Sequence, residues 1–207
     1  MPSGLLDTFG RMAGDAFALA VAWHAVVAIA VWRIALGGRP SRRAAATLLA
    51  VPLASVSGVA LAYGSWFNGI ACGALALALA TLGARHEDLV AHGGSGWAMV
   101  TGAALMSIGF GYPHFLEGRG LLAQLFGAPL GVLPCPTLFL LVGVALFADG
   151  FGGRAWPLLL SAAGLWYGLV GAVVLDVRID ALLAAGSLAL AASVLTRPRE
   201  RLVLRTP

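Results

Sequence analysis

Seven long apolar runs divide this sequence, and they constrain its fold more than any other feature. The runs cover about residues 16–37, 44–63, 66–84, 96–113, 134–149, 155–175 and 180–196. A helix needs roughly 20 apolar residues, at about 1.5 Å each, to cross the hydrocarbon core of a bilayer. The runs are continuously apolar, whereas the strands of a membrane barrel alternate every second residue. The sequence therefore predicts an all-α fold, a polytopic transmembrane helix bundle of about seven spans.

The composition supports a single integral-membrane domain over residues 1–207. Hydrophobic residues make up 60% of the chain and charged residues only 11%, whereas a soluble domain is nearer half apolar and a quarter charged. No stretch between the runs is long enough to form a separate soluble core. Residues 1–15 lack the basic start of a cleavable signal, so we expect the first run to be a permanent span.

The basic residues indicate an orientation in the membrane and not a nucleic-acid partner. All 13 are arginines, and they lie between or just beyond the apolar runs. Ten fall on one side of the predicted bundle, and only Arg11, Arg119 and Arg178 fall on the other. Because cytoplasmic loops carry the excess of positive charge, we expect a bacterial inner-membrane protein with its N-terminus outside and its C-terminus in the cytoplasm.

The linker between the fourth and fifth runs, residues 113–133, is long and lies on the outer side in this topology. Its glycines and prolines prevent one regular helix from forming. Irregular backbone at membrane depth persists only where protein covers it or where it lines a wet cavity. We therefore predict a re-entrant or interfacial outer loop. The residues expected to shape it are Pro113, Gly127, Pro129, Pro134 and Pro136.

Residues with chemistry to offer gather at the two ends of this linker. Tyr112 and His114 close the fourth run, and Cys135 and Thr137 open the fifth. We expect these four to form an outer vestibule or substrate site. A plainer interpretation is that the two prolines beside Cys135 fix a helix start, that Thr137 caps it, and that Cys135 packs as a small apolar residue.

A metal site is a weaker hypothesis for the same region. His114, Glu117 and Cys135 offer an imidazole, a carboxylate and a thiolate, which could ligate a soft or borderline metal ion. No CxxC or HxxxH pattern supports such a site, and the sequence identifies no cofactor.

His24 lies inside the first run, where an ionisable residue is a functional candidate by default. It could line the substrate path or ligate haem, but a bis-histidine haem site needs a partner at the same depth, and His114 lies near the outer boundary. A histidine that bonds a neighbouring helix is the plainer interpretation. Asp176 and Asp180 fall at the ends of runs, where charge is inexpensive, so neither is predicted to carry protons within the membrane.

Two glycine pairs, Gly69 with Gly73 and Gly164 with Gly168, place small residues four apart within runs. This spacing lets helix backbones approach closely. Packing within the bundle is the simple interpretation, and a homo-oligomer through one of these faces is the alternative.

Several stretches resemble a bacterial family of multi-pass membrane proteins of unknown function, domain-of-unknown-function family 6064. The stretches are Tyr112–Pro113, Phe126–Gly127–Ala128–Pro129, Pro134–Cys135–Pro136–Thr137, Trp166 to Gly171, and Asp180. The resemblance lies mainly in the C-terminal half of the chain. It implies a polytopic membrane fold without an established activity, and it adds weight to Cys135 and its neighbours as a site.

Three functions remain open. The one we favour is a small permease or channel for a neutral solute or a soft metal ion, with an outer-side vestibule. The second is a non-catalytic transmembrane subunit of a larger respiratory or photosynthetic complex, and the third is a haem or metal redox membrane protein. No nucleophile elbow, phosphate loop, dinucleotide fingerprint or HExxH motif supports an enzyme. The expected partner is the lipid bilayer, with other membrane subunits or a second copy left open, and without nucleic acid.

Overall fold

The computed structural model describes residues 2–36, 42–84, 94–115, 120–148 and 154–196, and every regular element within these ranges is a helix. In chain order the elements are α1 (Pro2–Asp15), α2 (Phe17–Ala35), α3 (Arg42–Ala62), α4 (Trp66–Ala84), α5 (Gly96–Phe110), α6 (Leu121–Gly127), α7 (Pro134–Phe147), α8 (Ala155–Leu169), the π-helical turn η2 (Val170–Val174) and α9 (Asp180–Leu195). Each of the seven apolar runs contains one of the longer helices, so the predicted all-α fold is confirmed for the described part of the chain.

Length and composition identify one continuous helix that could cross a membrane, which is α8 together with η2, Ala155–Val174. A second crossing is obtained only if Gly4–Asp15 and Phe17–Ala30, which meet at an angle of 68°, are counted as one span. The other apolar helices give shorter stretches of 10–17 residues. The number of spans therefore stays a prediction.

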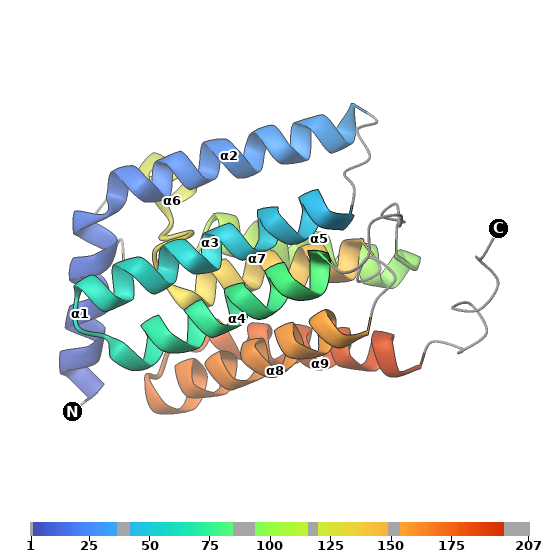
Figure 1. Cartoon of the computed structure of the whole chain (residues 1–207). Coiled ribbons are helices and arrows are strands. Elements are labelled where there is room, and N and C mark those ends of the chain that lie inside the picture. Colours follow the sequence, from blue (N-terminus) through green and yellow to red (C-terminus); the bar gives the residue numbers. More distant parts are fainter. Residues whose placement is uncertain (1, 37–41, 85–93, 116–119, 149–153, 197–207) are drawn as a thin grey trace, which may run out of the picture.

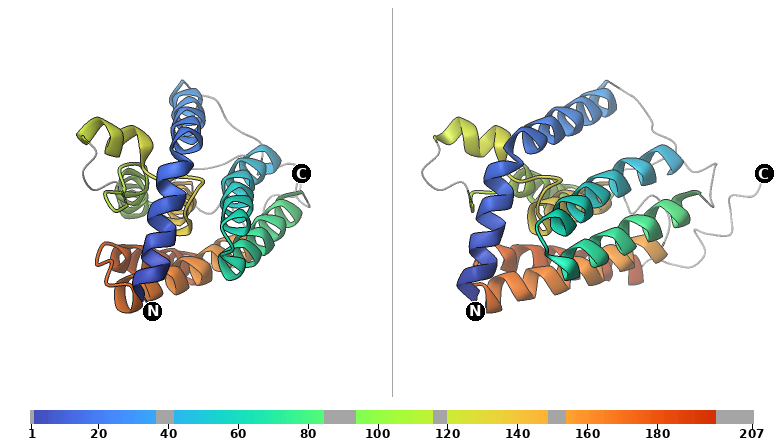
Figure 2. Two further views of the ribbon diagram at one scale, coloured as in Figure 1. Left: turned by 90° about the vertical axis from the view of Figure 1, so that its left-hand side faces the viewer. Right: turned by 60° about the vertical axis from the view of Figure 1, so that its left-hand side comes forward.

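The long helices run side by side in one bundle, with α7 at its centre (Figures 1 and 2). Eleven of the 14 residues of α7 are buried, among them Phe139 and Leu141. A helix that is apolar on all sides suits such a central position. Helices α3, α5, α8 and α9 pack around α7, while α4 pairs mainly with α3.

Glycines bring the backbones of α5 and α7 into direct contact. A Cβ atom at Gly143 would lie 2.7 Å from the carbonyl oxygen of Gly102, and one at Gly109 would lie 2.7 Å from that of Pro136. Real Cβ atoms almost never approach other atoms so closely, so only glycine fits these positions. The α5–α7 spacing therefore depends on the absence of side chains.

The glycine pairs predicted from spacing are used inside the chain. Gly73 faces the Ser57 hydroxyl of α3, and a Cβ atom at Gly168 would lie 2.5 Å from the backbone nitrogen of Ala184 in α9. Close packing within the bundle, the simpler interpretation of these pairs, is confirmed.

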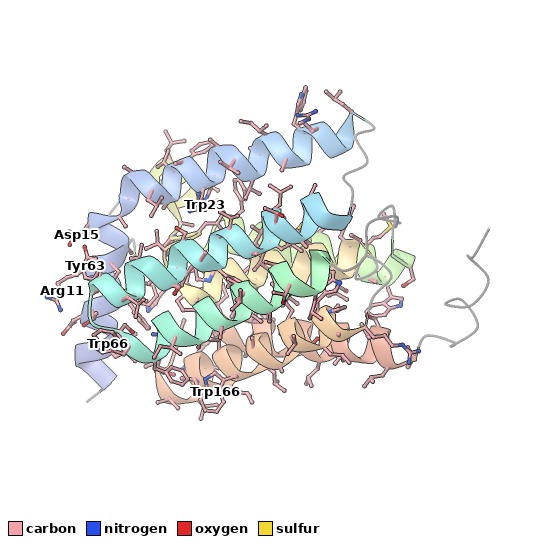
Figure 3. The ribbon with its side chains drawn as sticks, viewed as in Figure 1. Arg11, Asp15, Trp23, Tyr63, Trp66 and Trp166 are labelled. Carbon is pink, nitrogen blue, oxygen red and sulfur yellow. The ribbon has the colours of Figure 1, made fainter. Side chains whose placement is uncertain are left out.

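Helix α1 lies across one end of the bundle (Figures 1 and 2), and it meets α2 at an angle of 68°. Its inner face buries Phe9, Met12 and Ala13, and its outer face exposes Arg11 and other polar residues. The Tyr63 hydroxyl at the end of α3 donates to Asp15 over 2.8 Å, a pair that lies at this end of the bundle in Figure 3. The sequence analysis did not predict this helix.

The outer linker combines a short exposed helix with a buried irregular segment. Leu122 and Phe126 of α6 are exposed, but residues 127–134 are all buried. Gly131 has a φ of 68°, a conformation that favours glycine, and its Cα lies so close to the Trp23 ring that no Cβ would fit. Residues 128–133 thus form a buried irregular linker segment, and a re-entrant course in a membrane stays a prediction.

We expect Gly143→Ala to destabilise the protein by about 1–3 kcal/mol, because the added methyl group would push the backbones of α5 and α7 apart. Gly58→Ala is the matched control, since a Cβ at Gly58 meets no atom within 4 Å. That change should stabilise α3 by about 0.5–1 kcal/mol through helix propensity. Denaturant titration of both variants in detergent measures the difference, and equal midpoints would contradict the glycine contact.

Candidate functional site

The structure places a buried carboxyl group, that of Asp180, at the end of the bundle nearest α1. Asp180 opens α9, and its side chain is only 1% exposed. The hydroxyl of Tyr112, itself 0% exposed, donates to Asp180 Oδ1 over 2.8 Å. A hydrogen bond to a buried carboxyl group is worth more than one between neutral groups at the surface. Tyr112 and Asp180 therefore form a strong link between the end of α5 and the start of α9.

Gly171 makes room for the second oxygen of the same carboxyl group. A Cβ at Gly171 would overlap Asp180 Oδ2. Gly171 lies in the π-helical turn η2 that ends α8, and its carbonyl accepts the backbone N–H of Val177 over 2.9 Å. Single π-helical turns often occur at functional sites. The local change from α to π winding sets the Gly171 backbone beside the carboxyl group.

Cys135 joins this group from the first turn of α7. Its thiol interacts with the Asp180 carboxyl group, and the residue is half-buried. The prolines on either side, Pro134 and Pro136, occupy the start of α7, where a missing N–H costs no hydrogen bond. The predicted role of these prolines in starting the helix is confirmed. Tyr112 and Cys135, two residues of the predicted vestibule, thus meet at Asp180.

Thr137 is fully buried, and its hydroxyl binds backbone groups of the preceding linker. Its hydroxyl accepts the Gly131 N–H over 2.9 Å and donates to the Leu133 carbonyl over 2.7 Å. These two bonds fasten the buried linker segment to the first turn of α7. The prediction that Thr137 caps α7 is therefore wrong. The cap position is Leu133, which makes no side-chain hydrogen bond.

A second polar group lies next to the first. Tyr167 of α8 donates to Asn68 Oδ1 over 3.0 Å, and Asn68 in turn donates to the Ser65 hydroxyl over 2.8 Å. The Cys72 sulfur lies 3.9 Å from the Tyr167 oxygen. Since Tyr167 has one hydroxyl proton and gives it to Asn68, its oxygen is free to accept the Cys72 S–H. Polar side chains therefore extend from the α3–α4 turn toward Cys135 and Asp180.

His24 of α2 is buried and interacts with α5. Its Nδ1 lies 2.8 Å from the Ala20 carbonyl oxygen and its Nε2 lies 2.8 Å from that of Phe110. Both ring nitrogens face backbone oxygens, so neither is directed at a haem iron. The interpretation of His24 as a link from α2 to another helix is confirmed.

His114 lies at the outer edge of the group, on the turn that follows Tyr112. Its ring packs edge-on against Phe115, with 4.4 Å between the ring centroids. Phe115 in turn packs edge-on against Phe9 of α1, with 5.9 Å between the centroids. The neighbouring Pro113 is exposed. His114 is partly exposed, whereas the Asp180 carboxyl group is buried.

The metal hypothesis gains no support from the described residues. Among them, no three His, Cys, Asp or Glu side chains converge closely enough to hold a metal ion. Glu117, one of the three predicted ligands, lies outside the described residues.

Asp180 is the functional candidate that the sequence reasoning passed over. Its position at the start of an apolar run placed it at a membrane boundary, where charge is inexpensive. The signal available was a carboxyl residue nine positions after the last glycine of the stretch Trp166 to Gly171. Only the fold shows that Tyr112 and Gly171 surround the carboxyl group and that it is buried.

No family model, curated protein or solved structure matches the chain.

We expect Tyr112→Phe to destabilise the protein by about 1–3 kcal/mol, because it leaves a buried carboxyl oxygen without its donor. Tyr63→Phe is the matched control, since it removes an equally short bond to the exposed Asp15 and should change stability by no more than about 0.5 kcal/mol. Denaturant titration of both variants measures the two changes. Similar losses for the two variants would show that burial does not strengthen the Tyr112 bond.

Proposed function

We propose that this chain is a small multi-pass permease or channel of a bacterial inner membrane, and that it conducts a neutral solute past the Tyr112–Cys135–Asp180 group. The observation that carries this proposal is the burial of a hydroxyl, a thiol and a carboxyl group together, beneath irregular backbone at one end of an apolar bundle. Transport sites are often built where helices are broken and polar side chains converge.

The surface of the bundle supports a lipid environment. Many large apolar side chains face outward from its long helices, including Ile29, Val100 and Val173, which are 61%, 71% and 77% exposed. In water such a surface would favour aggregation, whereas lipid chains cover it without cost. Helix α1, with an apolar inner face and a polar outer face, suits the membrane boundary.

The chemistry of the group favours a neutral solute over a metal ion. The hydroxyl, thiol and carboxyl groups donate and accept hydrogen bonds, which suits an uncharged polar molecule. Among the described residues no arginine forms an ion pair with Asp180, and a carboxylate would repel an anion. A cation would require more ligands than this part of the chain supplies.

Access to the group from the outer side requires a change at α1. The inner face of α1 packs on Val132 and Leu133 of the buried linker segment and on Leu175 near Asp180. The chain bends by 68° between α1 and α2, so a hinge at Ala16 would let α1 lift without disturbing the bundle. The resemblance to domain-of-unknown-function family 6064 agrees with this membrane role and stays a prediction.

Proteoliposomes that contain the protein should take up glycerol or urea faster than empty liposomes in stopped-flow light scattering. His114→Ala combined with Cys135→Ala should slow this uptake about tenfold, as expected for the loss of roughly 1.4 kcal/mol of interaction with the solute. Ser107→Ala, which removes an exposed hydroxyl bonded only within α5, is the control and should leave uptake unchanged. If the double variant takes up solute as fast as the Ser107→Ala control, the solute does not pass this site.

Labelling of single added cysteines tests the orientation. Asp7→Cys places a thiol on the exposed face of α1, and Thr196→Cys places one at the exposed end of α9. In intact cells a membrane-impermeant maleimide should label Asp7→Cys and should label Thr196→Cys only after lysis. Wild-type protein gives the background, since Cys72 is buried and Cys135 half-buried. The reverse pattern would place the N-terminus in the cytoplasm.

A further inference from the structure

We infer that the Asp180 carboxyl group binds and releases a proton during transport, so that the solute moves together with H⁺. This inference rests on the proposed permease function and adds the ion that drives it. Its basis is a carboxyl group that is buried at the point where four helices meet and that accepts a hydrogen bond from a buried tyrosine.

The burial of Asp180 makes its charge expensive. An ionised carboxylate in a poorly solvated interior costs several kcal/mol unless a cation or several donors compensate it. The Tyr112 hydroxyl is one donor and the Cys135 thiol is a second. In the part of the chain that the structure describes, no arginine forms an ion pair with it. Uptake of a proton relieves this cost, so the group has two accessible states.

The surrounding side chains can satisfy both states in one geometry. When the group is charged, Oδ1 accepts from Tyr112, and the Cys135 thiol, which interacts with the carboxyl group, can donate to it. When the group carries a proton, the Cys135 sulfur can accept that proton, because a thiol is both a weak donor and a weak acceptor. Tyr112 keeps its bond to Oδ1 in both states. The hydrogen bond between Tyr112 and Asp180 is therefore the same with and without the proton.

The titratable and charged groups that face Asp180 come from every neighbouring element. Tyr112 and His114 follow α5, Cys135 begins α7, and Tyr167 with Cys72 lies beyond Cys135. On the turn before α9, Asp176 and Arg178 are 88% and 92% exposed and lie 3.9 Å from each other, so they face water. His114, which follows Tyr112, is partly exposed.

Solute binding and proton binding are linked at this site. A solute that donates a hydrogen bond to the carboxyl group stabilises its charged form, and one that accepts from it stabilises its protonated form. Linkage then requires that the proton affect solute affinity by the same factor. Helix α1 covers both events, because Phe9 packs on Phe115, which packs on His114.

Infrared spectroscopy of the protein in liposomes tests proton binding without any solute. The wild type should show a protonated-carboxyl C=O band that disappears as the pH is raised, and Asp180→Asn should lack this band. Asp176→Asn is the matched control and should keep the band, because Asp176 is exposed and asparagine also tolerates its positive φ of 56°. A band that persists in Asp180→Asn overturns the inference.

Tyr112→Phe gives a second assignment if Asp180→Asn does not fold. The carbonyl oxygen of the acid loses its Tyr112 hydrogen bond in this variant, so the C=O band should move to higher wavenumber. A band that does not move assigns the proton to another carboxyl group and overturns the inference.

Coupling is measured in proteoliposomes loaded with a pH-sensitive dye, with an imposed glycerol gradient. Wild-type protein and Asp176→Asn should move protons with glycerol, and Asp180→Asn should lose proton movement. Glycerol uptake without proton movement in the wild type overturns the coupling and leaves the permease function standing. If neither glycerol nor urea is taken up, the permease function fails, and the coupling fails with it.

Discussion

The carboxyl group of Asp180 is the constraint on which the arrangement of this bundle depends. It begins α9, receives a hydrogen bond from the residue that follows α5, contacts the first turn of α7, and lies against the π-helical end of α8. A buried acid that lost any of these neighbours would have to be solvated or the helices would have to separate. One polar group thus fixes the relative positions of four apolar helices that could otherwise slide past one another.

Glycine contacts make this convergence possible. Gly102, Gly109 and Gly143 allow α5 to touch α7, and Gly168 allows α8 to touch the first turns of α9. Apolar packing has little directional preference, so backbone contact sets the distances and the Tyr112–Asp180 bond sets the register. Replacement of any of these glycines with alanine is therefore expected to disturb the site as well as the helix packing.

Much of the fold could be predicted because the apolar runs are long and continuous. Their helical state follows from the backbone's need for internal hydrogen bonds in an apolar environment, and helix bounds agree closely with the runs. Helix α1 was missed because only one of its faces is apolar, and its aspartates and arginine resemble a solvated terminus. The meeting of Tyr112 with Cys135 followed from topology, since both flank one linker. The burial of Asp180 could not be predicted in the same way. The burial of a residue at a helix end depends on which segments cover that end, and not on the place of the residue in the apolar run.

The same cover explains why the polar group and the irregular backbone lie at one end of the molecule. Residues 128–133 leave helical geometry where Thr137 can satisfy the Gly131 N–H and where Trp23 can lie against the Gly131 backbone. Helix α1 then closes over this segment through Phe9 and Met12. An end built in this way holds its backbone polar groups satisfied while α1, bent away from α2 at Ala16, stays attached mainly by apolar contact. Apolar contacts have little directional preference, and contacts with lipid chains can replace them. No lipid chain can replace the Tyr112–Asp180 hydrogen bond. Motion at this end is therefore expected to begin at α1 and to leave the four-helix junction intact.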